Sequence, residues 1–154
     1  MNSEERYCVD ETLKHMNRVR SLLSDIIGKV FKRGIWHDKT KLENPEFDGF
    51  VEYTPKLRGM TYGSDEYKEC LEKMNRFLDH HYQKNPHHPE HYENGISDMS
   101  LIDIVEMLSD WKAATERHAD GDIMKSIENN QKRFGYSDDV KNILINTVEE
   151  MGWS

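Results

Sequence analysis

Residues 101–119 read LIDIVEMLSDWKAATERHA, a stretch with the residue spacing of one amphipathic helix. Ser100 stands before it at the position of an N-cap, and Gly121 follows it where such a helix would stop. One face of the helix carries the apolar residues Leu101, Ile104, Val105, Leu108 and Trp111. The stretch therefore predicts a helix that buries this face in a core.

The same periodicity predicts helices on both sides of this stretch. These additional helices are expected at about residues 9–33, 35–43, 64–84, 122–134 and 138–151. Strand signals are weak throughout. We therefore expect residues 1–154 to form one all-α domain of about six helices.

Two stretches rich in proline and glycine interrupt the helical pattern. Residues 44–63 hold two prolines and three glycines, and residues 84–99 contain the sequence NPHHPEHYENG. Both are predicted to be loops that lie over the functional site. The first loop is expected to form either a lid or a dimer contact, and the sequence leaves both open.

The composition excludes several classes of protein. The chain has 154 residues, 36% of them hydrophobic, and no run approaches the roughly 20 apolar residues that cross a bilayer. Its two cysteines form no CxxC motif, which excludes a disulfide framework and a cysteine-based zinc fold. The N-terminal sequence MNSEERYCVDE is acidic and lacks an apolar core, so we expect a cytoplasmic protein without a membrane partner.

The charge is distributed unevenly. The formal net charge is −8, yet residues 14–41 hold eight basic and two acidic residues and carry +6. An acidic protein with one basic segment is unsuited to general nucleic-acid binding and better suited to a small anionic ligand.

The eight histidines are the strongest chemical signal, because five of them lie within residues 80–91. Imidazole is a common ligand of divalent transition metals. His15 shares the apolar stripe of the first helix, and His81 falls on the apolar face of residues 64–84, so both are expected to point inward. His80 falls about a quarter turn outside that face and is expected to meet solvent.

Three acids lie along one side of the helix at 101–119. Asp103, Glu106 and Asp110 follow at i, i+3 and i+7 and have no basic partner in the stripe. They are expected to be either solvated or turned toward a cation, and both readings stay open.

The order of these groups resembles the HD-domain superfamily of all-α metal-dependent phosphohydrolases. An inward His15, the pair His37-Asp38 and the late Asp110 in SDWKAA match its H…HD…D motif. HDKTK at 37–41 is similar to the HD-x-x-K variant, whose lysine meets a substrate phosphate and is here Lys41. HHPEHYENG is similar to the His-His-Glu…Gly element of members that bind two metals.

Longer blocks resemble small HD-like proteins of uncharacterised function found in phages and bacteria. The blocks are NPHHPEH, DIVEMLSDWKAA and HADGDIMKSIENNQKRFG.

The resemblance implies a metal site between helices that binds one or two divalent ions of Mn, Fe, Co, Ni or Zn. The implied ligands are His15, His37, Asp38 and Asp110, with a second ion on His81, His88 and a bridging Asp38. Lys41, with Arg18 or Lys39, would neutralise the substrate phosphate. Asp38, Lys41 and Glu106 are the implied catalytic residues, and Glu106 or Asp103 would either orient ligands or act as a general base.

The function expected from this resemblance is hydrolysis of a small phosphate ester, with a nucleotide as the substrate class. Two alternatives stay open: a non-catalytic HD-like binding or inhibitor protein with a structural metal, and a di-iron oxygenase on the HD fold. A homodimer is also left open. His118 is expected to be structural, and no role is assigned to His80, His87 or His91.

Overall fold

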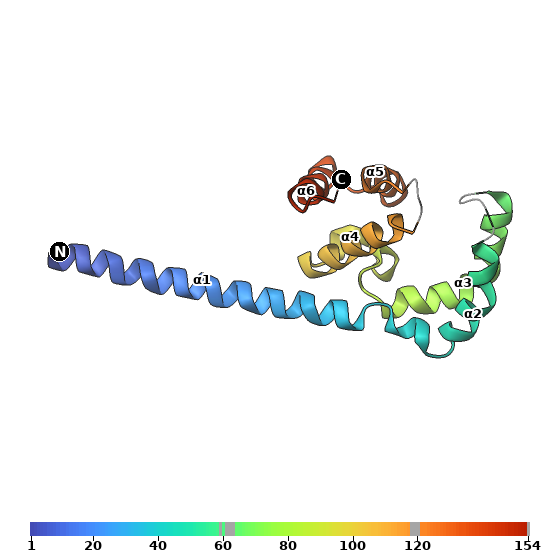
Figure 1. The fold of residues 1–154 in the computed structure, drawn as a ribbon, viewed down its shortest axis with the longest axis horizontal. Coiled ribbons are helices and arrows are strands. Elements are labelled where there is room, and N and C mark those ends of the chain that lie inside the picture. The colour runs from blue at the N-terminus through green and yellow to red at the C-terminus, as the bar shows by residue number, and fades with distance from the viewer. Residues whose placement is uncertain (59, 61–63, 118–120, 154) are drawn as a thin grey trace. The chain divides into compact units, whose positions relative to one another are not determined.

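The computed structural model describes residues 1–58, 60, 64–117 and 121–153 (Figure 1). Over these residues the chain is all-α and contains no strand, which confirms the predicted fold class. The elements are α1 (Ser3–Trp36), η1 (Lys39–Leu42), α2 (Glu46–Leu57), α3 (Asp65–Lys84), η2 (Pro89–His91), η3 (Gly95–Asp98), α4 (Leu101–Thr115), α5 (Ile123–Phe134) and α6 (Asp138–Glu150), where η marks a 3-10 helix.

The chain divides into two compact units, Met1–Ile35 and Trp36–Ser154. The first unit is the long helix α1, which Asn2 begins by accepting a hydrogen bond from the Glu5 backbone at 2.8 Å. None of the residues described in α1 is buried. The stripe that was predicted to point inward, including His15, is therefore exposed in this unit.

The hydrophobic core belongs to the second unit. It is formed mainly by α4, α5 and α6, and its most buried members include Met107, Leu108, Ile127, Leu144 and Val148. Each of these helices begins at a side-chain cap, from Ser100, Asp122 and Ser137 respectively. The predicted helices at these positions are confirmed, with boundaries that differ by a few residues.

Helix α2 corrects the prediction of a loop at residues 44–63. Residues 46–57 are helical, although Gly49 and Pro55 interrupt the expected pattern. Gly49 is buried because the ring of Phe77 from α3 fills the space that a Cβ atom would need. Pro55 removes one helical hydrogen bond, the one to the carbonyl of Val51, and α2 ends two residues later. Residues 59 and 61–63 of the predicted loop lie outside the described residues.

Helix α3 begins at Ser64, whose side chain accepts a hydrogen bond from the Tyr67 backbone, as the sequence predicted. It packs along α2 and η1 and ends before an irregular segment that contains η2 and η3. The predicted helical piece at 35–43 instead comprises the end of α1 and the short η1. Within the described part of the chain, no helix combines the length and apolar character that a membrane crossing requires.

Candidate metal centre

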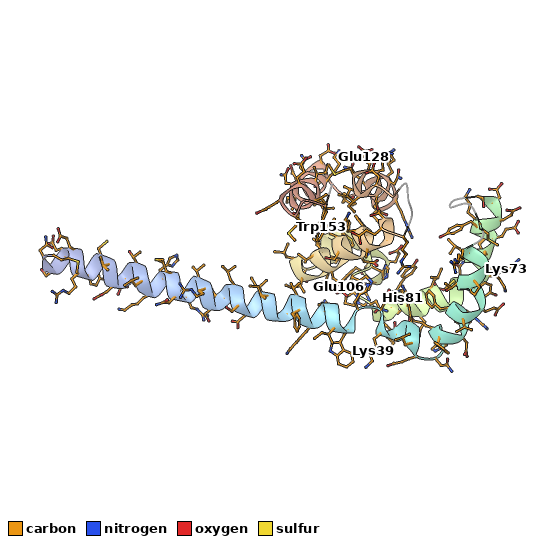
Figure 2. All side chains as sticks on the ribbon, in the orientation of Figure 1. Lys39, Lys73, His81, Glu106, Glu128 and Trp153 are labelled. Carbon is orange, nitrogen blue, oxygen red and sulfur yellow. The ribbon has the colours of Figure 1, made fainter. Side chains whose placement is uncertain are left out.

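The second unit gathers histidine and carboxylate side chains from η1 and its flank, the end of α3, the turn after it, and α4. Two groups of side chains each bring their potential ligand atoms within 4.8 Å of one another. The first group is Asp38, His81, His87 and His88, and the second is His37, His87 and Asp110. Figure 2 labels His81 of α3, which belongs to the first group, and Glu106 of α4, which lies beside the second. We call these six residues the histidine–aspartate cluster.

Asp38 lies between the two groups. Its Oδ1 atom is 3.2 Å from His81 Nε2 and 3.5 Å from His87 Nε2. Its Oδ2 atom is 3.5 Å from His37 Nε2 and accepts a hydrogen bond from Lys41. The backbone of Asp38 is left-handed, with φ 56° and ψ 14°, a conformation that aspartate tolerates better than most residues. One carboxylate thus faces both groups of imidazoles.

The environment of Asp38 keeps its carboxyl group ionised. Burial by itself would raise the pKa of Asp38. The neighbouring His81 ring and the charge of Lys41 outweigh burial and hold that pKa well below its usual range. The cluster is therefore built around a charged carboxylate.

His81 is oriented by a buried glutamate that the sequence analysis did not single out. Glu46 of α2 is fully buried, and its Oε2 lies 2.8 Å from His81 Nδ1. The Thr40 hydroxyl donates to the same oxygen at 2.9 Å, while Oε1 lies 2.8 Å from Nδ1 of the half-buried His80. Because the Glu46 carboxylate accepts a hydrogen bond from Nδ1–H of His81, the Nε2 atom is left with its lone pair toward the cluster.

His88 completes this side of the cluster. Its Nε2 atom lies 2.9 Å from His81 Nε2, so the two rings present their nitrogen atoms to the same point. Burial, together with the neighbouring His87 and His81, lowers the pKa of His88 to about 3. A neutral imidazole at this position has the protonation state that a metal ligand needs.

His37 occupies the other side with α4. Its Nε2 atom is 3.4 Å from Asp110 Oδ1, and its Nδ1 atom is 3.0 Å from Glu106 Oε1. The hydrogen bonds to Asp110 and Glu106 raise the pKa of His37 to about 10. The hydrogen bond from His37 lowers the pKa of Asp110 despite the opposing effect of burial. Two carboxylates therefore attract one positive charge at this point.

His87 belongs to both groups and is the member of the cluster whose ring nitrogen atoms have the fewest hydrogen bonds. Its side chain is 1% exposed, and neither ring nitrogen has a hydrogen-bond partner among the described residues. Its Nε2 atom faces Asp38, and its Nδ1 atom is 3.2 Å from Glu106 Oε1. Burying an imidazole without hydrogen bonds is costly, whereas a bound cation would satisfy the Nε2 lone pair. The cluster thus fits a metal ion on the chemistry of its donors and on this buried nitrogen.

The sequence analysis assigned no role to His87. Its only signal was its place beside His88 in the turn NPHHPEH, and that signal does not distinguish a ligand from a loop residue. Glu46 gave no signal either, because it lies in the predicted loop and faces His81 from 35 residues away.

The structure brings together most of the predicted site residues: His37, Asp38, Lys41, His81, His88, Glu106 and Asp110. Glu106 faces Nδ1 of both His37 and His87, which is the geometry of an orienting carboxylate. Asp103 instead accepts hydrogen bonds from Ser100 and Tyr92 and caps α4. Their catalytic or metal-binding roles stay predictions.

Other predicted or unassigned residues lie elsewhere. His15 and Arg18 are exposed on α1 in the first unit, and their roles as ligand and phosphate contact stay predictions. Lys39 is exposed, with its Nζ atom 3.9 Å from the ring centroid of Trp36. His91 donates from Nδ1 to the Tyr82 carbonyl at 2.9 Å. His118 lies outside the described residues.

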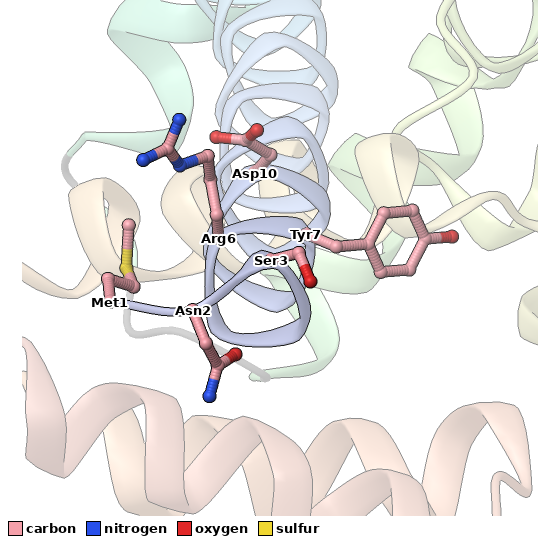
Figure 3. Close-up of a pocket in the computed structure, with 6 residues that line it drawn as sticks. All are labelled: Met1, Asn2, Ser3, Arg6, Tyr7 and Asp10. Atoms are coloured by element: carbon pink, nitrogen blue, oxygen red, sulfur yellow. The ribbon is translucent and has the colours of Figure 1, made fainter.

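A surface hollow at the start of α1 does not resemble this cluster. Figure 3 shows its lining residues, which are Met1, Asn2, Ser3, Arg6, Tyr7 and Asp10. All six side chains are exposed and come from the first turns of one helix. The hollow therefore has the character of an open helix surface.

The fold and the cluster define an all-α protein with a buried histidine–carboxylate centre. Residues 4–150 match the Family of unknown function (DUF5662), and the chain belongs to this family. No curated protein and no solved structure matches the chain.

Proposed function

We propose that this protein is a metal-dependent phosphohydrolase of the HD type that cleaves a small phosphate ester, with a nucleotide as the substrate class. The observation that carries the proposal is the histidine–aspartate cluster, above all the buried His87 ring that lacks hydrogen-bond partners among the described residues. The resemblance of His37-Asp38 and Asp110 to the HD motif supports the reaction class. The basic segment at 14–41 supports an anionic substrate.

The two groups of ligand atoms share His87, and Asp38 of the first group also faces His37 of the second, so the cluster would hold one or two ions. His37, His87 and Asp110 would hold one ion, and Asp38, His81 and His88 would hold a second. His15 remains a proposed additional ligand. Mixed imidazole and carboxylate donors suit Mn, Fe, Co, Ni or Zn. Bound in such a site, an ion supplies a Lewis acid and lowers the pKa of a coordinated water.

The protein's own residues would prepare the site for a phosphate. Glu106 and Glu46 would accept hydrogen bonds from Nδ1–H of His37 and His81, respectively, and so fix these two imidazoles with Nε2 directed inward. Lys41 lies beside Asp38 with its side chain 32% exposed, so its ammonium group is available at the edge of the cluster. There it would neutralise negative charge that develops on the phosphoryl oxygens.

The test is a hydrolysis screen of the full-length protein loaded with Mn²⁺, Co²⁺, Ni²⁺ or Zn²⁺. Nucleoside mono-, di- and triphosphates would be assayed for release of phosphate or pyrophosphate. We expect turnover with at least one metal, and a loss of about 100-fold or more in Asp38→Asn at unchanged helical circular dichroism.

Lys41→Ala provides the sharper test of the substrate contact. We expect it to raise KM about tenfold or more while metal content stays the same, because Lys41 is placed to contact substrate. Lys56→Ala, an exposed lysine paired with Glu52, is the matched control and should leave KM unchanged. Stoichiometric metal without turnover would contradict hydrolysis and favour a binding protein, and oxygen consumption that requires iron would favour an oxygenase.

A further inference from the structure

Helix α1 carries an unusually long apolar stripe that no described residue of its own unit covers. Nine of its large apolar side chains are each between 40% and 70% exposed: Val9, Leu13, Met16, Val19, Leu22, Leu23, Ile26, Ile27 and Phe31. A contiguous exposed stripe of this kind is rare on a solitary helix and marks an interaction surface. Because the first unit is a single helix, its apolar face can be buried only against another element.

The spacing of the stripe is that of a coiled-coil seam. Val9, Met16, Leu23 and Val30 recur every seven residues, with Thr12, Val19 and Ile26 recurring between them. Alternating steps of three and four residues over three heptads keep one narrow face toward a partner helix. The occupant indicated by the spacing is therefore another long helix with the same repeat.

The charge along α1 specifies how a second copy would lie. Residues 4–11 hold four acids and one base, a net charge of −3, whereas residues 29–33 hold three bases and no acid, a net charge of +3. A parallel pair would place like charges side by side at both ends. An antiparallel pair places the acidic end of each helix along the basic end of the other.

We propose that α1 pairs with α1 of a second copy of this chain in an antiparallel coiled coil, which makes the protein a homodimer. With the pair centred on Ser21, Val19 faces the partner's Leu23, and Met16 faces the partner's Ile26. The seam is thus self-complementary, as a two-fold interface requires.

The area also suffices for a dimer. Nine apolar side chains per helix lie in or beside the seam, namely Val30 and those named above except Phe31, and each would remove roughly 50 Å² from water. The two helices together bury on the order of 1,000 Å², which is the lower range for specific interfaces.

The first experiment measures the mass of the full-length protein in solution by light scattering after gel filtration. We expect twice the monomer mass for the wild type and a monomer for Leu23→Glu. Ser24→Glu adds the same charge one position away, at a residue outside the seam, and should stay dimeric. A wild-type monomer, or a Leu23→Glu dimer as stable as the wild type, would overturn the proposal.

The second experiment determines the direction of the pair. Cys8 is exposed and Cys70 is buried, so a spin label attaches selectively to Cys8, with Cys8→Ala as the unlabelled control. In the antiparallel pair the two Cys8 residues are separated by 26 residues of helix, or about 39 Å. A label distance below about 20 Å would show parallel helices and overturn the proposed pairing.

Discussion

Glutamate side chains contact the Nδ1 atoms of three imidazoles in the cluster. Glu46 holds Nδ1 of His81, and Glu106 lies within 3.2 Å of Nδ1 on His37 and His87. By facing Nδ1, these acids direct Nε2 of each ring toward the centre, so they decide which nitrogen can act as a ligand. We therefore assign a positioning role to Glu46 and Glu106.

Replacing Glu46 tests this role. Glu46→Gln should reduce metal affinity by about 10- to 100-fold, because the amide no longer fixes Nδ1 of His81 as the protonated atom. Glu52→Gln on the same helix alters an exposed residue and should bind metal like the wild type. Titration with Mn²⁺ or Ni²⁺ measures both, and equal affinities would contradict the role of Glu46.

The raised pKa of His37 predicts a pH dependence of the metal-free protein. The hydrogen bonds to Asp110 and Glu106 raise this pKa from 6.5 to about 10. A raised pKa contributes stability that is fully present below the unfolded value of 6.5 and disappears as the pH rises through 10.

The measurement is urea unfolding of the wild type and His37→Gln in the presence of EDTA. The difference between their free energies of unfolding should be largest near pH 6 and should shrink toward pH 10. A difference that does not vary with pH would show that His37 is not charged between these two acids.

At the scale of elements, the packing of α2 on α3 places Glu46 beside His81. Gly49 permits this close approach, because the ring of the buried Phe77 occupies the place of a Cβ atom. We expect Gly49→Ala to destabilise the second unit by about 1–3 kcal/mol, since Phe77 or α2 must shift. Metal affinity should fall with it, because α2 carries Glu46.

The matched control for Gly49→Ala is Gly28→Ala. Gly28 also lies inside a helix, but a Cβ atom there meets no atom within 4 Å. This change should leave stability the same or raise it by up to about 1 kcal/mol, because alanine favours helix. Thermal unfolding of both variants distinguishes the two effects, and a tolerated Gly49→Ala would contradict the described packing.

Local sequence signals were sufficient for most helices and failed for α2. Capping residues such as Ser64 and Ser100 and regular apolar periods are readable within one segment. The prolines and glycines of residues 44–63 predicted a loop, and the contact of Gly49 with Phe77 that permits a helix there depends on a residue far along the chain. Tertiary packing overrides intrinsic propensity at that point.

At the scale of the whole molecule, the site residues that were predicted have a local sequence motif, whereas those that were missed depend on contacts between distant segments. The resemblance to the HD motif implied that His15, His37, Asp38, His81, His88 and Asp110 would share a site. All of these except His15, which belongs to the first unit, lie close together in the second unit. His87 and Glu46 were missed because their importance arises only where η1, α2, α3 and α4 meet. In the first unit, the charge and spacing of the exposed seam on α1 are the signals from which we infer a second copy as its partner.

The most direct test of the central claim, that the histidine–aspartate cluster holds a transition metal, is elemental analysis of the full-length protein. The wild type and Asp38→Asn would be loaded with Mn²⁺ or Ni²⁺, desalted and analysed. Asparagine tolerates the left-handed backbone of this position, so the substitution removes the charge of the central carboxylate while preserving the fold.

We expect about one or two metal ions per chain in the wild type, a clear loss in Asp38→Asn, and full retention in Asp48→Asn, an exposed aspartate of α2. No bound metal in the loaded wild type, or the same metal content in Asp38→Asn, would contradict the account.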